Sequence, residues 1–340
     1  MDAKITKKRL SHMLSYDWLK IVAVAVAVII VWTLIFTMTS TRITAAQQFS
    51  VVNYFGNVSS TYDPKMDDRA QAALKENVFS YEVIETSLVD VPSYQEQAYT
   101  ILEARVATQE GDVIYVPDIQ KADSEYEITV DGKTEKRYDS YLQDLVRRYG
   151  YSLYNLDPNA ENGYFKSMEK FLNRYYEGGY EAGERNDELI KTDFLARVKK
   201  NKDKRFKTDA QIAQGIQDEI KRIQKYRDGL VEFYGYVQEG LVSFTHTTVY
   251  DQETGEPYTR LDGIFSINLC PNKDTMGGLK TVACYNETVK NAEGEDVPVP
   301  TALNMNVAFF YFKETEASFE YENLLYVNYI IRSVKTTAQE

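Results

Sequence analysis

The sequence predicts an α/β domain that follows a single membrane-spanning helix. Two observations lead to this prediction. An apolar run without a charged residue covers positions 21–38, and eighteen residues are about enough to cross the hydrocarbon core of a bilayer as a helix. Beyond that run, strand-like and helix-like segments alternate between positions 49 and 118. Such alternation is typical of a sheet built from parallel strands joined by helices.

The apolar run reads IVAVAVAVIIVWTLIFTM, and the only two tryptophans, Trp18 and Trp32, lie beside it or within it. Lys4, Lys7, Lys8, Arg9 and Lys20 precede the run, against Asp2 and Asp17. Positive charge on one side of a membrane span favours the cytoplasmic side. We therefore expect a single-pass cell-membrane protein with an extracytoplasmic domain. Its parts are a cytoplasmic tail at 1–20, a transmembrane helix at 21–40 and a spacer at 41–48.

A cleaved signal peptide is the alternative interpretation of this end of the chain. Its basic start would fit, and Ala45-Ala46 could complete a cleavage site of small residues. Three features favour a retained anchor instead. The run is longer than a usual signal core, Trp32 and Phe36 are bulky near its end, and Arg42 separates it from any cut. Both interpretations place the larger part of the chain outside the cytoplasm.

The part beyond the anchor is strongly acidic. Only six of the 39 basic residues and two of the 51 acidic residues lie in positions 1–48, which leaves a net charge of −16 beyond them. Such a surface repels phosphate backbones. We therefore expect no nucleic-acid partner, and we interpret the charge mainly as a source of solubility.

Residues 49–118 carry the strand and helix patterns in alternation. Strands are predicted over 49–55, 81–91 and 112–118 from their β-branched and aromatic content. Helices are predicted over 67–77 and 94–108, where small and aliphatic residues recur at helical spacing. The third strand is apolar along most of its length, as expected for a strand that is covered on both faces.

The rest of the chain divides by the same patterns. We place a first α/β block at 49–130, a mainly helical block at 131–240 and a block of strands with a closing helix at 241–340. The helical block is predicted to contain a helix within 134–150 and helices over 165–176, 187–198 and 209–238. The last block is predicted to contain strands over 243–250, 263–269, 280–285 and 306–312 and a closing helix within 319–334.

The chain has two cysteines, Cys270 and Cys284, on either side of a turn-rich stretch that includes Gly277-Gly278. An oxidising compartment permits a disulfide between them. Two separate buried thiols are the alternative. Two cysteines are too few for a four-cysteine zinc site.

Motifs that carry catalysis are absent from the sequence. No HExxH, GxSxG, P-loop or GxGxxG pattern is present. Beyond the anchor the only histidine is His246, in the alternating segment FTHTTVY, where we expect a structural or exposed side chain. We therefore expect a protein that is not an enzyme and that holds no metal and no cofactor. An extracellular enzyme that uses carboxylates alone remains a minor alternative.

Candidate ligand-binding residues follow from the predicted sheet. Ligands bind open parallel sheets outside the carboxyl ends of the strands, and tyrosine offers an apolar face together with a hydroxyl. The candidates near the ends of the first and third strands, with one from the facing helix, are Asn53, Tyr54, Phe55, Asn57, Tyr115, Asp118 and Tyr141.

Two segments, FSVVNYFGN and YQEQAYTILEARVATQEGDVIYVPD, resemble the extracytoplasmic solute-binding proteins of ABC transporters. The closer match runs from Leu102 to Asp118, where a helix leads into a strand that ends near the ligand cleft of the family. The resemblance implies a two-lobed periplasmic-binding-protein-like fold with a parallel sheet and a helical insert. This chain departs from the family by carrying an apolar helix where a lipid-modified cysteine is usual, and by lacking tryptophan beyond that helix.

The resemblance implies capture of a small solute, a sugar or similar, for delivery to an ABC permease. A second hypothesis is a cell-envelope structural or interaction protein that keeps this fold without a ligand. The two hypotheses differ in whether a small solute stabilises the domain.

Overall fold

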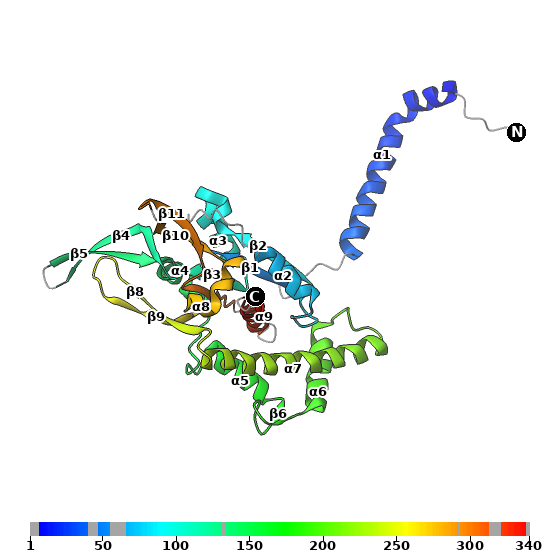
Figure 1. Ribbon diagram of the computed structural model, residues 1–340. Coiled ribbons are helices and arrows are strands. Elements are labelled where there is room, and N and C mark those ends of the chain that lie inside the picture. The colour runs from blue at the N-terminus through cyan, green and yellow to red at the C-terminus, as the bar shows by residue number, and fades with distance from the viewer. Residues whose placement is uncertain are drawn as a thin grey trace. The chain divides into compact units, whose positions relative to one another are not determined.

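The computed structural model describes residues 7–39, 47–54, 66–130, 133–291, 293–312 and 321–337 (Figure 1). The chain divides into two compact units, residues 1–44 and residues 45–340, and each is treated by itself. The first part of the predicted tail and most of the predicted spacer lie outside the described residues.

The first unit contains one long helix, α1 (Lys7–Thr39). Its 33 residues correspond to about 50 Å of helix. The side chains from Trp18 to Ile35 are exposed, and this window is long and apolar enough either to cross a membrane or to act as a signal sequence. The hydroxyl of Thr33 donates to the carbonyl oxygen of Ile29 at 2.7 Å, so this polar group is paired within the helix.

The second unit is organised around one mixed sheet of six strands. The first three strands in the sheet are parallel, as predicted, and each of the others runs antiparallel to its neighbours. The α/β class is therefore confirmed, with strands from both ends of the unit in one sheet. In spatial order the strands are β2 (Glu85–Asp90), β1 (Gln48–Asn53), β3 (Val113–Pro117), β12 (Met305–Phe309), β9 (Pro257–Asn268) and β8 (Ser243–Tyr250).

Helices cover both faces of this sheet, which gives three layers. In β3 the side chains of Val113 and Tyr115 enter one core, and those of Ile114 and Val116 enter the other. The first face, called the α9 face, packs against α2 (Met66–Lys75), α5 (Tyr164–Asn173), α7 (Asp209–Gln238) and α9 (Glu322–Thr337). The second, called the α4 face, packs against α3 (Ala98–Ala107) and α4 (Tyr141–Tyr149).

Local sequence signals fix the starts of two helices. The Thr208 hydroxyl accepts from the Gln211 backbone N–H, and the Gln211 side chain accepts from the Thr208 N–H, so α7 begins with a capping box. Ser140 and Gln143 form the same reciprocal pair at the start of α4. Such caps satisfy backbone donors that the helix itself leaves open. The predicted helix over 209–238 is confirmed in full.

Two regions differ from the sequence predictions. Residues 120–140 form the antiparallel hairpin of β4 (Gln120–Val130) and β5 (Lys133–Ser140), so the block at 131–240 begins with a strand. The predicted strand over 280–285 instead covers the end of a 3₁₀ helix and a turn, and only Tyr285 lies in a strand. The elements not yet named are η2 (Val91–Gln97), η3 (Gly150–Ser152), β6 (Tyr176–Glu177), β7 (Glu184–Arg185), α6 (Asp187–Asn201), α8 (Lys273–Met276), η4 (Gly277–Thr281), β10 (Tyr285–Lys290) and β11 (Asp296–Thr301).

The two cysteines are buried thiols, and no disulfide joins them. The Cys270 thiol lies 3.6 Å from the carbonyl oxygen of Met276, and burial raises the pKa of this thiol to about 11. The chain between the cysteines passes through α8 and η4, where Met276 and Leu279 are fully buried. Of the two interpretations of the cysteines, the structure therefore agrees with two buried thiols.

Candidate functional site

Between β1 and β3 the connecting helices change from one face of the sheet to the other. We call this place the switch point of the sheet. The helix α2 that joins β1 to β2 packs on the α9 face, and the helix α3 that joins β2 to β3 packs on the α4 face. The carboxyl ends of β1 and β3 are neighbours in the sheet. In open α/β sheets this is the place where ligands bind, so the polar groups gathered there form the candidate site.

Tyr54 follows the last residue of β1 and points into the α4 face. Its backbone N–H donates to the Tyr115 carbonyl oxygen at 2.8 Å, which keeps it aligned with β3. Its hydroxyl donates to Oδ2 of Asp144 on α4 at 2.5 Å, and both side chains are buried. A carboxylate from the helix layer is thereby joined to the end of the first strand.

Two cations share the same carboxylate. The Nζ atom of Lys121 lies 3.2 Å from Asp144 Oδ2, with both side chains only 8% exposed. The Nε atom of Arg148 donates to Asp144 Oδ1 at 3.1 Å, one helical turn further along α4. Asp144 therefore has three partners. We call the residues Tyr54, Tyr99, Lys121, Asp144 and Arg148 the Asp144 cluster.

Tyr99 of α3 adds an aromatic ring to this cluster. The guanidinium carbon of Arg148 lies 4.4 Å from the centre of the ring, and Nζ of Lys121 lies 5.5 Å from it. The Tyr54 and Tyr99 rings meet edge to face, with centroids 6.3 Å apart. Cations placed over an aromatic face are attracted by its negative potential. The Arg148 side chain is 38% exposed, so this guanidinium reaches solvent while Lys121 and Asp144 do not.

A second set of contacts holds α4 in position behind the cluster. Arg147 makes a bidentate pair with the buried Asp139 at the end of β5, at 2.7–3.0 Å. It also donates to the Tyr250 carbonyl oxygen at 2.8 Å, and Gln143 donates to that of Thr248 at 2.9 Å. These bonds tie the helix to the β4–β5 hairpin and to β8. Asp144 is therefore carried by a helix that is fixed on two sides.

The cluster changes the ionisation of its members. Burial raises the pKa of the Tyr54 phenol far above its usual value, and the charge of Asp144 raises it further. Burial lowers the pKa of the Lys121 ammonium, but Tyr99 and Asp144 more than reverse this and leave it raised. Burial and Asp144 oppose each other in the same way at Arg148, whose pKa is also raised. Tyr54 therefore acts as a neutral donor between two permanent cations.

Three other predicted site residues lie near this end of the sheet. Asn53 is buried, and its amide nitrogen donates to Oδ1 of Asp90 at the end of β2 at 2.7 Å. The Asp118 N–H donates to the Asn304 carbonyl oxygen at 2.9 Å, just after β3. Tyr141 is the first residue of α4, and its ring packs in the same core as Tyr54. Of the predicted site residues that the structure describes, Tyr54 alone is a member of the Asp144 cluster.

Tyr115 is a different case, because it faces the other layer. The alternation along β3 turns its side chain into the α9 face, where it is fully buried beside Tyr326 of α9. Only its backbone carbonyl contacts Tyr54. The structure therefore separates Tyr115 from the candidate site. Phe55 and Asn57 lie outside the described residues.

Sequence reasoning missed four members of the cluster, namely Tyr99, Lys121, Asp144 and Arg148. One signal could have identified Asp144. It lies three residues after Tyr141, on the apolar stripe of α4, and a charged residue on a buried helical face needs a partner. Arg148 follows at the next helical turn and supplies one. Lys121 comes from a hairpin that the sequence pattern did not reveal.

The arrangement offers hydrogen-bond donors and an aromatic face at a strand end. Among the described residues, no group of three or more His, Cys, Asp or Glu side chains is arranged to hold a metal ion. His246 lies on β8 with its side chain 61% exposed, 3.6 Å from Asp262, in agreement with the exposed position expected for it. Comparisons with protein-family models, with curated proteins and with solved structures find no match to this chain.

Proposed function

We propose that this chain is a membrane-tethered, extracytoplasmic binding protein that captures a small solute, a sugar or similar, for an ABC permease. It performs no turnover in this proposal. The observation that carries the proposal is the Asp144 cluster, in which cations and an aromatic ring lie at the switch point between the parallel strands β1 and β3.

The solute class follows from the part of the cluster that solvent reaches. Arg148 supplies guanidinium donors, and the Tyr99 ring beside it supplies a flat apolar surface. Sugars present hydroxyl groups at their edges and C–H groups on their faces, so they match such a pair of groups. Asn53 and Asp90, paired at the ends of β1 and β2, add further polar atoms at the same edge of the sheet.

The proposal includes the membrane anchor and its orientation. In it, α1 crosses the bilayer, residues 1–20 are cytoplasmic and the α/β unit is outside. The intact mass of the protein purified from the membrane fraction tests this. A retained residue 1 supports the anchor, whereas a chain that begins after position 46 in the soluble fraction identifies a cleaved signal peptide.

The proposal also includes two lobes that close on the solute, with residues 131–240 as the second lobe. Such closure has to move α5 and α7, which pack against α9 within one core. Small-angle scattering with and without a bound solute measures the change. A radius of gyration that stays constant while the solute is bound excludes closure but leaves binding intact.

A thermal-shift screen of the full chain in detergent micelles tests solute capture. The panel contains monosaccharides, disaccharides, amino acids, short peptides and nucleosides. A ligand at a hundredfold excess over its Kd stabilises a protein by about 2.7 kcal/mol. We expect one sugar class to raise the melting temperature, and Arg148→Gln to abolish that shift. Glu239→Gln, at an exposed side chain paired with Lys335 just beyond α7, is the control and should keep it.

A second candidate function is an envelope interaction module without a solute. The observation in its favour is that Asp144 already has three partners inside the protein, so the cluster is complete without a ligand. A folded sample that responds to no member of the panel supports this second function over the first.

A further inference from the structure

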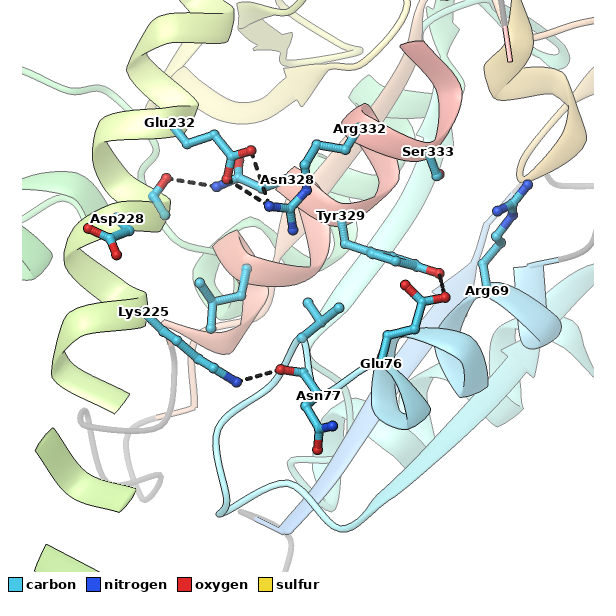
Figure 2. A pocket seen from close by; sticks show the side chains of 13 residues that line it. Arg69, Glu76, Asn77, Lys225, Asp228, Glu232, Asn328, Tyr329, Arg332 and Ser333 are labelled. Atoms are coloured by element: carbon cyan, nitrogen blue, oxygen red, sulfur yellow. Dashed lines mark hydrogen bonds and ion pairs between the residues drawn. The ribbon is translucent and has the colours of Figure 1, made fainter. Parts of the chain in front are cut away.

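Two parts of the α/β unit outside the Asp144 cluster carry many charges. One is a cavity of about 680 Å³ between α2, α7 and α9, which we call the cavity beneath α9 (Figure 2). The other covers the end of α6 and its connection to α7, residues 197–207, which we call the basic loop. The two differ in whether their charged groups are paired within the protein.

Charged groups around the cavity beneath α9 are paired with other groups of its walls. The Tyr329 hydroxyl donates to Glu76 at 3.2 Å, which joins α9 to α2. Arg332 lies 3.3 Å from Glu232, which joins α9 to α7, and Figure 2 shows these two side chains facing each other. The Lys225 ammonium donates to backbone carbonyl oxygens of the segment that follows α2. These bonds hold the three helices together.

Asn328 of α9 also lines this cavity, and its side chain is 1% exposed. Its amide nitrogen donates to the Gly229 carbonyl oxygen of α7 at 2.7 Å. Its amide oxygen Oδ1 has no hydrogen-bond partner among the described residues. Paired walls and one buried acceptor do not select a class of ligand, so no ligand is assigned to this cavity.

The basic loop is different, because its lysines face solvent. It contains seven basic residues and one acidic residue, in a unit whose net charge is −16. Its exposed lysines are Lys199, Lys200, Lys202, Lys204 and Lys207. Within the part of the chain that the structure describes, none of these five ammonium groups has a hydrogen bond or an ion pair. The loop is therefore a patch of free positive charge on an acidic domain.

The end of α6 accounts for only two of these lysines. Lys199 and Lys200 lie in its last turn, where the helix dipole favours positive charge. Lys202 caps the helix with a φ of +50°, a left-handed conformation in which glycine or asparagine is usual. Lys204 and Lys207 lie beyond the cap. The needs of the helix therefore leave three of the lysines unexplained.

The arginines of the basic loop attach it to the rest of the unit. Nη1 of Arg205 lies 2.7 Å from the buried carboxylate of Glu82. Arg197 lies 3.5 Å from Glu82 and 2.8 Å from Glu219 of α7. Asp203, the acid of the loop, pairs with Arg205 at 2.6 Å. The arginines and the acid thus pair within the protein, and the lysines are left on the outside.

The basic loop lies at the end of the unit where the chain arrives from α1. Glu82, which holds Arg205, lies two residues before Ile84. The Ile84 N–H donates to the carbonyl oxygen of Gln47, the first described residue of the unit, at 2.8 Å. Eight peptide links join Gln47 to Thr39 at the end of α1, and this length of chain spans at most about 30 Å. A membrane crossed by α1 is therefore kept near this end of the unit by the chain itself.

Two exposed apolar side chains accompany the lysines. Ile84 is 52% exposed, and Leu195 is 38% exposed, one helical turn before Lys199 on α6. Surfaces that lie on membranes combine basic side chains with apolar ones of this kind.

We propose that the basic loop docks on the anionic phospholipid headgroups of the membrane that α1 crosses. The exposed lysines meet the lipid phosphates, whereas the rest of the acidic surface is repelled by them, so the unit takes one orientation on the membrane. Because α1 keeps the loop at a high local concentration near the headgroups, weak individual contacts are sufficient. The proposal rests on the anchor of the function proposed above and needs no solute.

Energy transfer in lipid nanodiscs tests this proposal with the full chain. A donor fluorophore is attached at Ala210→Cys, on the exposed first turn of α7 just beyond the loop, and the acceptors are on lipid headgroups. The discs contain either phosphatidylcholine alone or an equal mixture of phosphatidylcholine and the anionic phosphatidylglycerol. Cys270 and Cys284 are buried thiols, so the introduced cysteine should take the label.

We expect the transfer from Ala210→Cys to be about twofold larger in the anionic discs than in the neutral ones. Sodium chloride at about 0.5 M should remove the difference, because it screens charges beyond a few ångströms.

A donor at Asp274→Cys on α8 is the positional control. This helix follows β9 at the carboxyl end of β3, where the Asn304 N–H donates to the Cys270 carbonyl oxygen at 3.0 Å and the Asp118 N–H donates to that of Asn304 at 2.9 Å. That end of the sheet is opposite to the end at which Gln47 enters. Transfer from Asp274→Cys should therefore not rise in the anionic discs.

Variants assign the rise to the lysines. One variant removes three charges of the loop: Lys202→Gln, Lys204→Gln and Lys207→Gln. Since no described residue bonds to these ammonium groups, the variant should fold like the parent and lose the rise. The matched control removes three charges from α8, η4 and β10: Lys273→Gln, Lys280→Gln and Lys290→Gln. It changes the net charge by the same amount and should keep the rise.

Three results overturn the proposal. They are equal transfer from Ala210→Cys in both kinds of disc, an equal rise from Asp274→Cys, and a rise that survives in the loop variant. A chain that does not co-elute with the discs refutes the anchor, and this proposal with it. A chain that co-elutes but shows equal transfer refutes the docking alone and leaves the anchor intact.

Discussion

The Asp144 cluster and the cavity beneath α9 contain the same kinds of group. They differ in whether a buried polar atom is left without a hydrogen-bond partner. Each joins charges of both signs to tyrosine hydroxyls on one face of the sheet. In the cluster, three donors surround one carboxylate. The buried charges of Asp144 and Lys121 are therefore satisfied within the protein. The exposed Arg148 beside Tyr99 is what is left to meet a ligand. In the cavity, the Asn328 amide oxygen, a buried acceptor, is itself left without a partner.

Of the predicted variants, Asp144→Ala should lower the free energy of unfolding the most. It leaves the cationic groups of Lys121 and Arg148 without their shared carboxylate, and breaking a buried ion pair costs about 3–5 kcal/mol. Urea unfolding of the full chain, followed by tyrosine circular dichroism, measures the loss. Glu188→Gln, whose side chain is 83% exposed, is the control and should change the free energy of unfolding by less than about 0.5 kcal/mol. A loss below about 1 kcal/mol for Asp144→Ala would mean that the cluster is not a structural element.

The pH dependence of stability should come from Asp112, the residue just before β3. Burial raises the pKa of Asp112 to about 7, despite its hydrogen bond from the Ser50 N–H. The unfolded carboxyl titrates near 4, so between about pH 4 and pH 7 the folded state binds more protons than the unfolded state. Stability should therefore fall as pH rises through this window, by at most about 4 kcal/mol. Asp112→Asn should flatten the curve, and an unchanged slope would assign the titration to another group.

Tyr54→Phe tests one bond of the cluster. It removes the hydroxyl that donates to Asp144 at 2.5 Å and leaves the ring in its core. A hydrogen bond to a charged group contributes about 1.5–3 kcal/mol, and we expect a loss in that range on urea unfolding. Tyr151→Phe, at a side chain that is 70% exposed, is the matched control and should be neutral. Equal stability of the two variants would contradict the assigned role of Tyr54.

Two glycines of α7 give the smallest expected effects, and they differ in sign. A Cβ atom at Gly229 would lie 2.7 Å from Cδ2 of Leu325 in the cavity wall, whereas one at Gly235 would meet nothing within 4 Å. Gly229→Ala should therefore destabilise the protein by about 1–3 kcal/mol through overpacking. Gly235→Ala should stabilise it by up to about 1 kcal/mol through helix propensity. If both variants were stabilising, the contact between α7 and α9 would be looser than described.

The fold was predictable where one residue pattern governs one element. The three parallel strands were predicted from their β-branched and aromatic content and the turn signals beside them, although the second was predicted over 81–91 and forms only over Glu85–Asp90. A long stripe of aliphatic residues was enough to predict α7. The β4–β5 hairpin was missed because its strands are largely polar and charged, so they lack the alternation that marks a half-buried strand.

The candidate site was predictable only in its location. The rule that ligands bind at strand ends identified Tyr54 but also selected Tyr115, since one sequence does not say which face a buried strand residue takes. Asp144 meets Tyr54 across 90 residues of sequence, and Lys121 meets Asp144 rather than Tyr54. The cavity combines α2 with two helices from the far end of the chain, and no local pattern relates those segments.

The position of β12 between β3 and β9 has a consequence for how this protein folds. β3 ends at Pro117, and its partner strand begins only at Met305, so one edge of β3 stays unpaired while about 190 further residues are made. At typical synthesis rates of about 5–20 residues per second, this takes roughly 10–40 s. An unpaired apolar edge is prone to aggregation, and closing so long a loop is slow. The nascent chain should therefore depend on a chaperone that covers this edge until β12 arrives.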